Sequence, residues 1–136
     1  MQTHKMLAFA LLGAVLLASG CKRETKDEMF HRTFEQLTQK ECPKYVDPCT
    51  RLDSASYDIP SRTVSYNYTV DGLLDNDSIY TDEHVDAFRE EILKGLKNSI
   101  QMKPYKDESV SFRYIYYSMK TGRLLLELSY SPDDYR

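Results

Sequence analysis

The side chains that could perform catalysis are few and lie far apart in the sequence. Nucleophilic catalysis needs a Ser or Cys nucleophile beside a general base, and no Ser occurs in a Gly-x-Ser-x-Gly turn. His31 falls in a charged helical stretch, and His84 falls in the first turn of a second predicted helix. We expect both to be solvated, and we predict that the protein is not an enzyme.

Carboxylates offer metal binding as a second chemistry. Residues 71–82 place acidic side chains at several positions of a twelve-residue calcium loop. Leu73 and Ile79 occupy two ligand positions, however, and Asn76 replaces the glycine that the turn requires. A zinc site would need two ligands besides a cysteine pair, and the His residues are distant in sequence. We therefore expect a plain acidic loop, no metal and no cofactor.

Cys21 ends a stretch with the features of an export signal. Lys5 precedes an uninterrupted apolar run, residues 6–18, and small residues stand before the cysteine. A basic start, a short apolar run and small residues before a cleavage point are typical of a secretory signal peptide. The run is shorter than the roughly 20 residues that a membrane-spanning helix needs.

The sequence Leu17-Ala18-Ser19-Gly20-Cys21 resembles the lipobox of bacterial lipoprotein precursors. This resemblance implies cleavage before Cys21 and attachment of lipid, typically including palmitate, to its thiol and its new amino group. Ala18 departs from the Leu that is most frequent in the family.

The residue after the lipidated cysteine bears on location. Lys22 follows Cys21 in place of Asp, which, by resemblance to the sorting rule of enteric bacteria, implies the outer membrane. The charged run 22–28 is also similar to export tags of surface lipoproteins in the Bacteroides group. A periplasmic face and a surface face of the cell envelope both remain open.

The leader defines the organisation of the rest of the chain. We expect a signal peptide at 1–20, a lipidated tether at 21–26 and a single domain at 27–136. The full chain has a formal net charge of −3, and losing Lys5 with the leader makes it −4. This acidity argues against a nucleic-acid partner and against electrostatic attraction to anionic headgroups. Membrane attachment would therefore depend on the lipid.

Cys42 and Cys49 remain as an even pair in an oxidising compartment. Pro43 and Pro48 restrict the intervening loop. A disulfide is the favoured interpretation, and it would contribute roughly 2.5 kcal/mol by limiting the unfolded chain. Two separate buried thiols are the alternative.

The helices and strands follow from local patterns. A helix is predicted over 26–40, where Thr25 and Glu28 fit a capping box, and an amphipathic helix over 82–100. Alternating apolar residues predict four strands, at 50–59, 63–70, 109–117 and 123–130. The class is α+β: an N-terminal helix, then β-β-α-β-β, with a four-stranded, mainly antiparallel sheet packed on the amphipathic helix.

The mature region resembles small uncharacterised bacterial envelope domains. The resemblance rests on Cys42-Pro43, Asp47, Thr50-Arg-Leu-Asp53, Tyr66-x-Tyr68-Thr69, and Val110-Ser-Phe-Arg-Tyr114 followed by Gly122. It implies one extracytoplasmic domain and carries no activity with it.

One face of the third predicted strand suggests an interaction patch. Its members are Arg113, Ile115, Tyr117 and Leu125. If the amphipathic helix covers the opposite face, this patch is open to solvent, and Arg and aromatic residues are enriched in interface cores. We favour the alternative that the first helix covers it, because Phe30, Phe34 and Leu37 need burial.

Together these features predict a lipid-anchored envelope protein that is a non-enzymatic protein-binding or accessory module. One alternative is an immunity or inhibitor lipoprotein whose acidic surface blocks a toxin or hydrolase. Another is a small-ligand-binding lipoprotein, which a concave pocket lined by the Tyr-rich strands would favour. All 11 Tyr residues follow Cys21.

Overall fold

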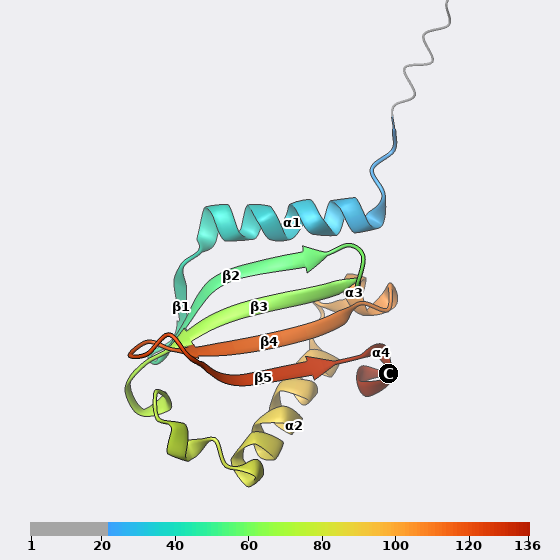
Figure 1. Ribbon diagram of the computed structural model, residues 1–136. Coiled ribbons are helices and arrows are strands. Elements are labelled where there is room, and N and C mark those ends of the chain that lie inside the picture. The colour runs from blue at the N-terminus through green and yellow to red at the C-terminus, as the bar shows by residue number, and fades with distance from the viewer. Residues whose placement is uncertain (1–21) are drawn as a thin grey trace, which may run out of the picture.

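A computed structural model describes residues 22–136 (Figure 1). The predicted leader, its cleavage point and the lipidation site Cys21 lie outside the described residues. Within residues 22–136, no helix is both long enough and apolar enough to cross a membrane.

The described chain has an α+β fold, as predicted. Its elements are α1 (Lys26–Glu41), β1 (Lys44–Asp47), β2 (Thr50–Asp58), β3 (Thr63–Val70), two 3-10 turns (Gly72–Leu74 and Asp77–Ile79), α2 (Asp82–Asn98), α3 (Lys103–Asp107), β4 (Ser111–Ser118), β5 (Leu124–Tyr130) and α4 (Pro132–Tyr135). The predicted order of an N-terminal helix and then β-β-α-β-β therefore holds for the main elements.

The sheet has five strands in place of the four predicted, and it is mainly antiparallel, as predicted, with one parallel pair. Its strand order is β1-β2-β3-β4-β5, and β3 and β4 are parallel while the other neighbours are antiparallel. The extra strand, β1, forms in the segment expected to be a loop, because Pro43 and Pro48 fall just outside it and leave its ladder intact. The parallel pair arises because α2 returns the chain to the end of the sheet where β3 began.

Helix α1 begins at the predicted capping box. The Thr25 hydroxyl accepts a hydrogen bond from the Glu28 backbone N at 3.1 Å, and the Thr25 backbone N donates to Glu28 Oε2 at 2.9 Å. Phe30 and Phe34 of α1 are buried. They pack on Tyr105 of α3, with ring centroids 4.6 and 5.3 Å away.

Both long helices lie on the same face of the sheet. Phe34 of α1 contacts Tyr66 of β3, with ring centroids 6.0 Å apart, and Phe88 of α2 contacts Tyr116 of β4 at 5.6 Å. Tyr66 and Tyr116 point to this shared face. In Figure 1 the strands lie in front of α2 and α3, and α1 runs beside β2.

The expectation that α1 covers the opposite face is therefore wrong. The apolar side of α1 is buried instead against Tyr57, Tyr66 and Tyr105, beside β2 and α3. Among residues 22–136, no helix covers the face that carries Arg113, Ile115 and Tyr117.

The disulfide weighed from the sequence is absent from the structure, where Cys42 and Cys49 are free thiols. Cys42 precedes β1 and Cys49 follows it, and β1 pairs with β2 from Lys44 opposite Leu52. Strand β1, which lies between the two cysteines, is extended and rises about 13 Å over its four residues. A disulfide requires Cα atoms within about 7 Å.

Candidate functional site

Four tyrosines from the parallel strand pair form a ladder on the helix-covered face. Strand β3 contributes Tyr66 and Tyr68, and β4 contributes Tyr114 and Tyr116. The parallel register sets Tyr66 opposite Tyr114 and Tyr68 opposite Tyr116. Their stacked rings have centroids 5.3 and 4.9 Å apart. We call these four residues the tyrosine ladder.

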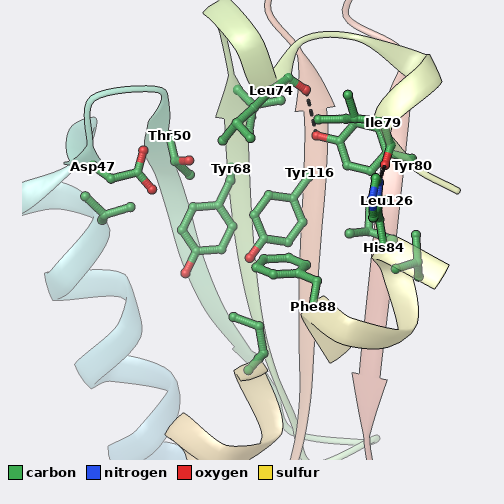
Figure 2. Close-up of a pocket in the computed structure, with 14 residues that line it drawn as sticks. Asp47, Thr50, Tyr68, Leu74, Ile79, Tyr80, His84, Phe88, Tyr116 and Leu126 are labelled. Atoms are coloured by element: carbon green, nitrogen blue, oxygen red, sulfur yellow. Dashed lines mark hydrogen bonds between the residues drawn. The ribbon is translucent and has the colours of Figure 1, made fainter. Parts of the chain in front are cut away.

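A cavity of about 430 Å³ lies between one end of the ladder and α2. Tyr68 and Tyr116 form its sheet side, Phe88 and Ile92 its helix side, and Tyr80 part of its loop side. Figure 2 shows Tyr68 and Tyr116 extending in the same direction, with Phe88 beside Tyr116. The volume of the cavity falls in the range of about 300–1,000 Å³ that is typical of small-molecule sites.

Two largely buried residues of the cavity wall, Thr50 and Tyr116, carry hydroxyls that make no hydrogen bond to residues 22–136. Thr50 is 5% exposed and Tyr116 is 7% exposed, and both line the cavity. No side-chain N or O atom of the described residues is both fully enclosed and unpartnered. The two hydroxyl oxygens therefore reach the open space of the cavity, where a ligand group or water could bond to them.

Several other tyrosines of the domain donate their hydroxyls to backbone carbonyls. Tyr130 donates its hydroxyl hydrogen to the Arg89 carbonyl at 2.9 Å, and Tyr135 donates to the Val110 carbonyl at 2.7 Å. Tyr80, in the cavity wall, donates to the Leu74 carbonyl at 2.7 Å (Figure 2). Buried Tyr hydroxyls usually find such partners.

Burial keeps the ladder hydroxyls in their neutral form. It raises the pKa of Tyr68 to about 12, and it raises the pKa of Tyr116 well above its ordinary value. At neutral pH both phenols are therefore protonated and can donate a hydrogen bond.

The cavity rim is polar but carries little charge. Among residues 22–136, Asp47 is its only carboxylate, and Asp47 Oδ1 accepts a hydrogen bond from the Cys49 backbone N at 2.8 Å. His84 lies 2.9 Å from the Ile79 carbonyl oxygen through its Nδ1. No Lys or Arg of the described part of the chain lines the cavity.

The acidic loop predicted at 71–82 forms part of the cavity wall. Asp75 is buried, and its carboxylate accepts hydrogen bonds from Ser118 Oγ at 2.5 Å and from the Lys120 backbone N at 3.0 Å. The Ser118 and Lys120 bonds lower the pKa of Asp75. Asp75 thus fastens the loop to the β4–β5 turn and is not available as a metal ligand. Within residues 22–136, no three His, Cys, Asp or Glu side chains are grouped to hold a metal ion.

The interaction patch inferred from the sequence lies on the uncovered face, with one change. Arg113 donates to Glu127 Oε1 from its Nη2 at 2.6 Å, and Ile115 is only 7% exposed. A register shift in β5 sets Leu124, which is 53% exposed, opposite Tyr117. Leu125 packs partly against the core cluster instead. We define the open-face patch as Arg113, Ile115, Tyr117 and Leu124.

Sequence reasoning did not identify the cavity. Its signal was present in the repeated Tyr-x-Tyr pattern of β3 and β4. That pattern indicates that the tyrosines of each strand share one face, but it does not predict the strand register that stacks Tyr68 on Tyr116.

Solved structures share this fold at very low sequence identity. A Pseudomonas aeruginosa protein described as secreted aligns with a TM-score of 0.64 and 9% identity, over 81% of this chain and 96% of its own. The pilotin EpsS of the Vibrio vulnificus type 2 secretion system gives 0.59 and 9%, over 81% and 91%. The type II secretion system pilotin AspS of Vibrio cholerae gives 0.56 and 12%, over 79% and 90%. These likenesses establish the fold.

A comparison with curated protein sequences finds no match. A family described as Domain of unknown function (DUF8479) matches residues 25–126. The matched segment runs from the N-cap of α1 into β5, and it includes the tyrosine ladder and every residue that lines the cavity. The chain is therefore a member of the DUF8479 family.

Proposed function

We propose that the protein is a lipid-anchored, non-enzymatic accessory protein of the bacterial cell envelope that binds a protein partner. Two type II secretion pilotins with the same fold support an accessory role. The lipobox-like sequence ending at Cys21 supports attachment through lipid. The observation that carries the proposal is the sheet face that no described helix covers.

The position of the tether orients the domain. Lys26, at the start of α1, forms an ion pair with Glu108, just before β4 begins. The cavity lies near the opposite end of β4, around Tyr116. Residues 22–25 span at most about 14 Å. A short tether at one end of the sheet would hold the domain near the membrane and leave the sheet face accessible to a partner.

The open-face patch has the composition of a docking surface. Tyr117 and Leu124 are cross-strand neighbours that offer apolar area, and aromatic residues are enriched in interface cores. The ion pair of Arg113 with Glu127 neutralises the charge beside them. A partner with an apolar, largely uncharged surface fits this patch.

The inhibitor alternative receives less support from the same face. Its acidic side chains are paired with arginines: Asp53 with Arg51 at 2.6 Å and Glu127 with Arg113 at 2.6 Å. The negative charge of the chain is therefore not concentrated there, as it would be in a surface complementary to a basic toxin.

Crosslinking in intact cells, followed by purification of the protein from membranes, tests the partner. We expect a reproducible protein to be captured by the wild type and lost with the double substitution Tyr117→Ser and Leu124→Ser. Ile100→Ser is the matched control, because Ile100 is 86% exposed and follows α2, on the helical side of the sheet. Equal capture by the double variant and the control would contradict docking at the patch, and capture of no protein would contradict the partner itself.

Membrane fractionation tests the anchor separately. Cys21→Ala should release the protein from membranes or leave an uncleaved precursor. Membrane retention of a product of mature length would refute lipid attachment at Cys21.

A further inference from the structure

A basic pocket lies at the end of the domain where the tether enters. It occupies about 570 Å³ between the C-terminal end of α2, helix α3 and the end of α4. Four cationic side chains line it, Lys97, Lys103, Lys106 and Arg136, against one carboxylate of residues 22–136, Asp107. The chain as a whole is acidic, but charges beyond the Debye length of about 8 Å are largely screened. The positive charge of the pocket itself therefore decides what it attracts.

We infer that this pocket binds the phosphate headgroup of an anionic phospholipid in the membrane that anchors the chain. The cationic side chains contact the phosphate, and the exposed Ile100 beside them enters the edge of the acyl region. The inference rests on the proposed lipid anchor, since the anchor is what holds the pocket against a bilayer.

The pocket has positive charge available for a phosphate. Lys97 is exposed, and its side chain makes no hydrogen bond or ion pair with residues 22–136. Lys103 forms an exposed ion pair with Asp107 at 2.6 Å, and exposed pairs of this kind contribute little energy. Lys106 donates to the carbonyls of Leu96 and Lys97, at 2.9 Å each. These bonds cover the C-terminal carbonyls of α2, whose partial negative charge would repel a phosphate.

The carboxylates beside the pocket do not cancel its charge. Glu108 pairs with Lys26. Asp133 lies 3.9 Å from Arg136, and its side chain is 95% exposed. Arg136 also donates to the Ser109 hydroxyl through Nη2. Together with the pocket, these pairs give five cations against three carboxylates, so the balance stays positive.

The tether brings the pocket close to the membrane. The ion pair of Lys26 with Glu108 joins the start of α1 to the end of α3, and Ser109, next to Glu108, lines the pocket. The start of α1, helix α3 and the C-terminus lie at the same end of the sheet (Figure 1). Residues 22–25 span at most about 14 Å, so a lipid on Cys21 would keep the pocket within reach of the bilayer surface.

Ile100 supplies the apolar part of the site. It follows α2, lines the pocket and is 86% exposed. An apolar side chain beside cations is typical of surfaces that lie in the headgroup region of a membrane. Burying one Ile side chain there would strengthen association roughly tenfold or more. Leu73 is equally exposed, at 87%, but it follows β3, at the other end of the sheet.

Tryptophan fluorescence tests the inference, because the chain contains no Trp. The full chain carrying Ile100→Trp is purified from membranes and reconstituted into vesicles with brominated acyl chains. The vesicles consist of phosphatidylcholine alone or of an equal mixture with phosphatidylglycerol. We expect a blue-shifted emission and roughly twofold stronger quenching in the mixture. Leu73→Trp is the matched control and should give the same emission in both kinds of vesicle.

Charge substitutions in the Ile100→Trp chain provide the decisive comparison. Each Lys near an anionic surface strengthens association about fivefold. Lys97→Gln combined with Lys103→Gln should therefore reduce quenching to the level found in phosphatidylcholine alone. Lys40→Gln combined with Lys44→Gln is the matched control, because it removes the same charge from exposed positions around the end of α1. About 1 M NaCl, where the Debye length is about 3 Å, should weaken the quenching in the mixture.

Flotation of the same vesicles separates this inference from the proposed anchor. Protein that floats with both kinds of vesicle supports the anchor. Equal quenching of Ile100→Trp in the two kinds of vesicle, or equal quenching after the pocket and the control Lys substitutions, would then overturn the inference alone. Protein that floats with neither refutes the anchor and the inference with it. Partner capture should be unchanged by the pocket substitutions, because the open-face patch is a separate surface.

Discussion

Replacing Tyr116 by Phe should stabilise the domain, although most substitutions of buried residues destabilise proteins. The change removes only the hydroxyl and keeps the ring, whose centroid lies 4.9 Å from that of Tyr68 and 5.6 Å from that of Phe88. A fully buried polar group without a partner costs about 1–3 kcal/mol, and the Tyr116 hydroxyl, which is not fully enclosed, should cost less. Water entering the cavity would offset part of that cost, so we expect a gain of about 1 kcal/mol in the free energy of unfolding.

Tyr130→Phe is the same chemical change with the opposite expected sign. Tyr130 is 2% exposed, and its hydroxyl donates to the Arg89 carbonyl at 2.9 Å. Removing this donor leaves the Arg89 carbonyl without that bond, and we expect the free energy of unfolding to fall by about 1 kcal/mol. The two variants should therefore differ from each other by about 2 kcal/mol.

Equilibrium urea unfolding of a protein that consists of residues 22–136, purified free of bound lipid, measures both changes in the free energy of unfolding. The midpoint should shift while the denaturant slope stays constant, because neither variant alters the surface exposed on unfolding. In thermal unfolding, 1 kcal/mol corresponds to about 4 °C for a domain of this size. If Tyr116→Phe destabilises the domain as much as Tyr130→Phe, the Tyr116 hydroxyl is satisfied in solution, and the reasoning from an unpartnered hydroxyl is refuted.

Three further substitutions test other contacts. Thr25→Ala removes the capping box of α1 and should lower the free energy of unfolding by about 1 kcal/mol in urea; an unchanged midpoint would contradict the cap. Phe34→Ala should lower the free energy of unfolding by about 3–5 kcal/mol in the same measurement, because it leaves a cavity where the Phe34 ring packs on Tyr66. A decrease below 1 kcal/mol would contradict that packing. The lowered pKa of Asp75 means that its contribution is present above the unfolded pKa of about 3.9 and is lost as pH falls through the folded value. Amide hydrogen exchange in residues 71–81 should therefore accelerate in acid, and in Asp75→Asn it should already be faster at pH 7; an Asn variant with wild-type protection at pH 7 would show that Asp75 does not fasten the loop.

The elements recovered from the sequence are those defined by short-range patterns. Alternation in β3 predicted residues 63–70, which the structure matches at both ends. The cap at Thr25 placed the start of α1 correctly, because a cap is a contact between residues three positions apart, and α2 begins at residue 82 as predicted. The prediction of helix to residue 100 exceeded the observed end of α2 at Asn98, since helix ends are weakly specified by sequence.

Whether the patch is exposed and whether the cysteines can bond depends on contacts between separate segments, which local sequence patterns do not reveal. The apolar face of α1 had two sheet faces available to it, and only the packing of Phe30 and Phe34 with Tyr105 of α3 selects one. Proximity in sequence suggested a bond between Cys42 and Cys49, but β1 forms between them and holds them apart. In both cases the deciding partner lies outside the local segment.

The sequence by itself determined the local elements, the α+β class, the acidity of the chain and the expectation of a lipid on Cys21, because each depends on residue type and near-neighbour spacing. Only the tertiary structure decided that β3 and β4 are parallel, that both long helices share one face, and that Tyr68 and Tyr116 line one cavity. The physical reason is that β3 and β4 are separated by the whole of α2, so their register is set by the packing of distant segments. That register stacks Tyr68 on Tyr116 and so forms the sheet side of the cavity.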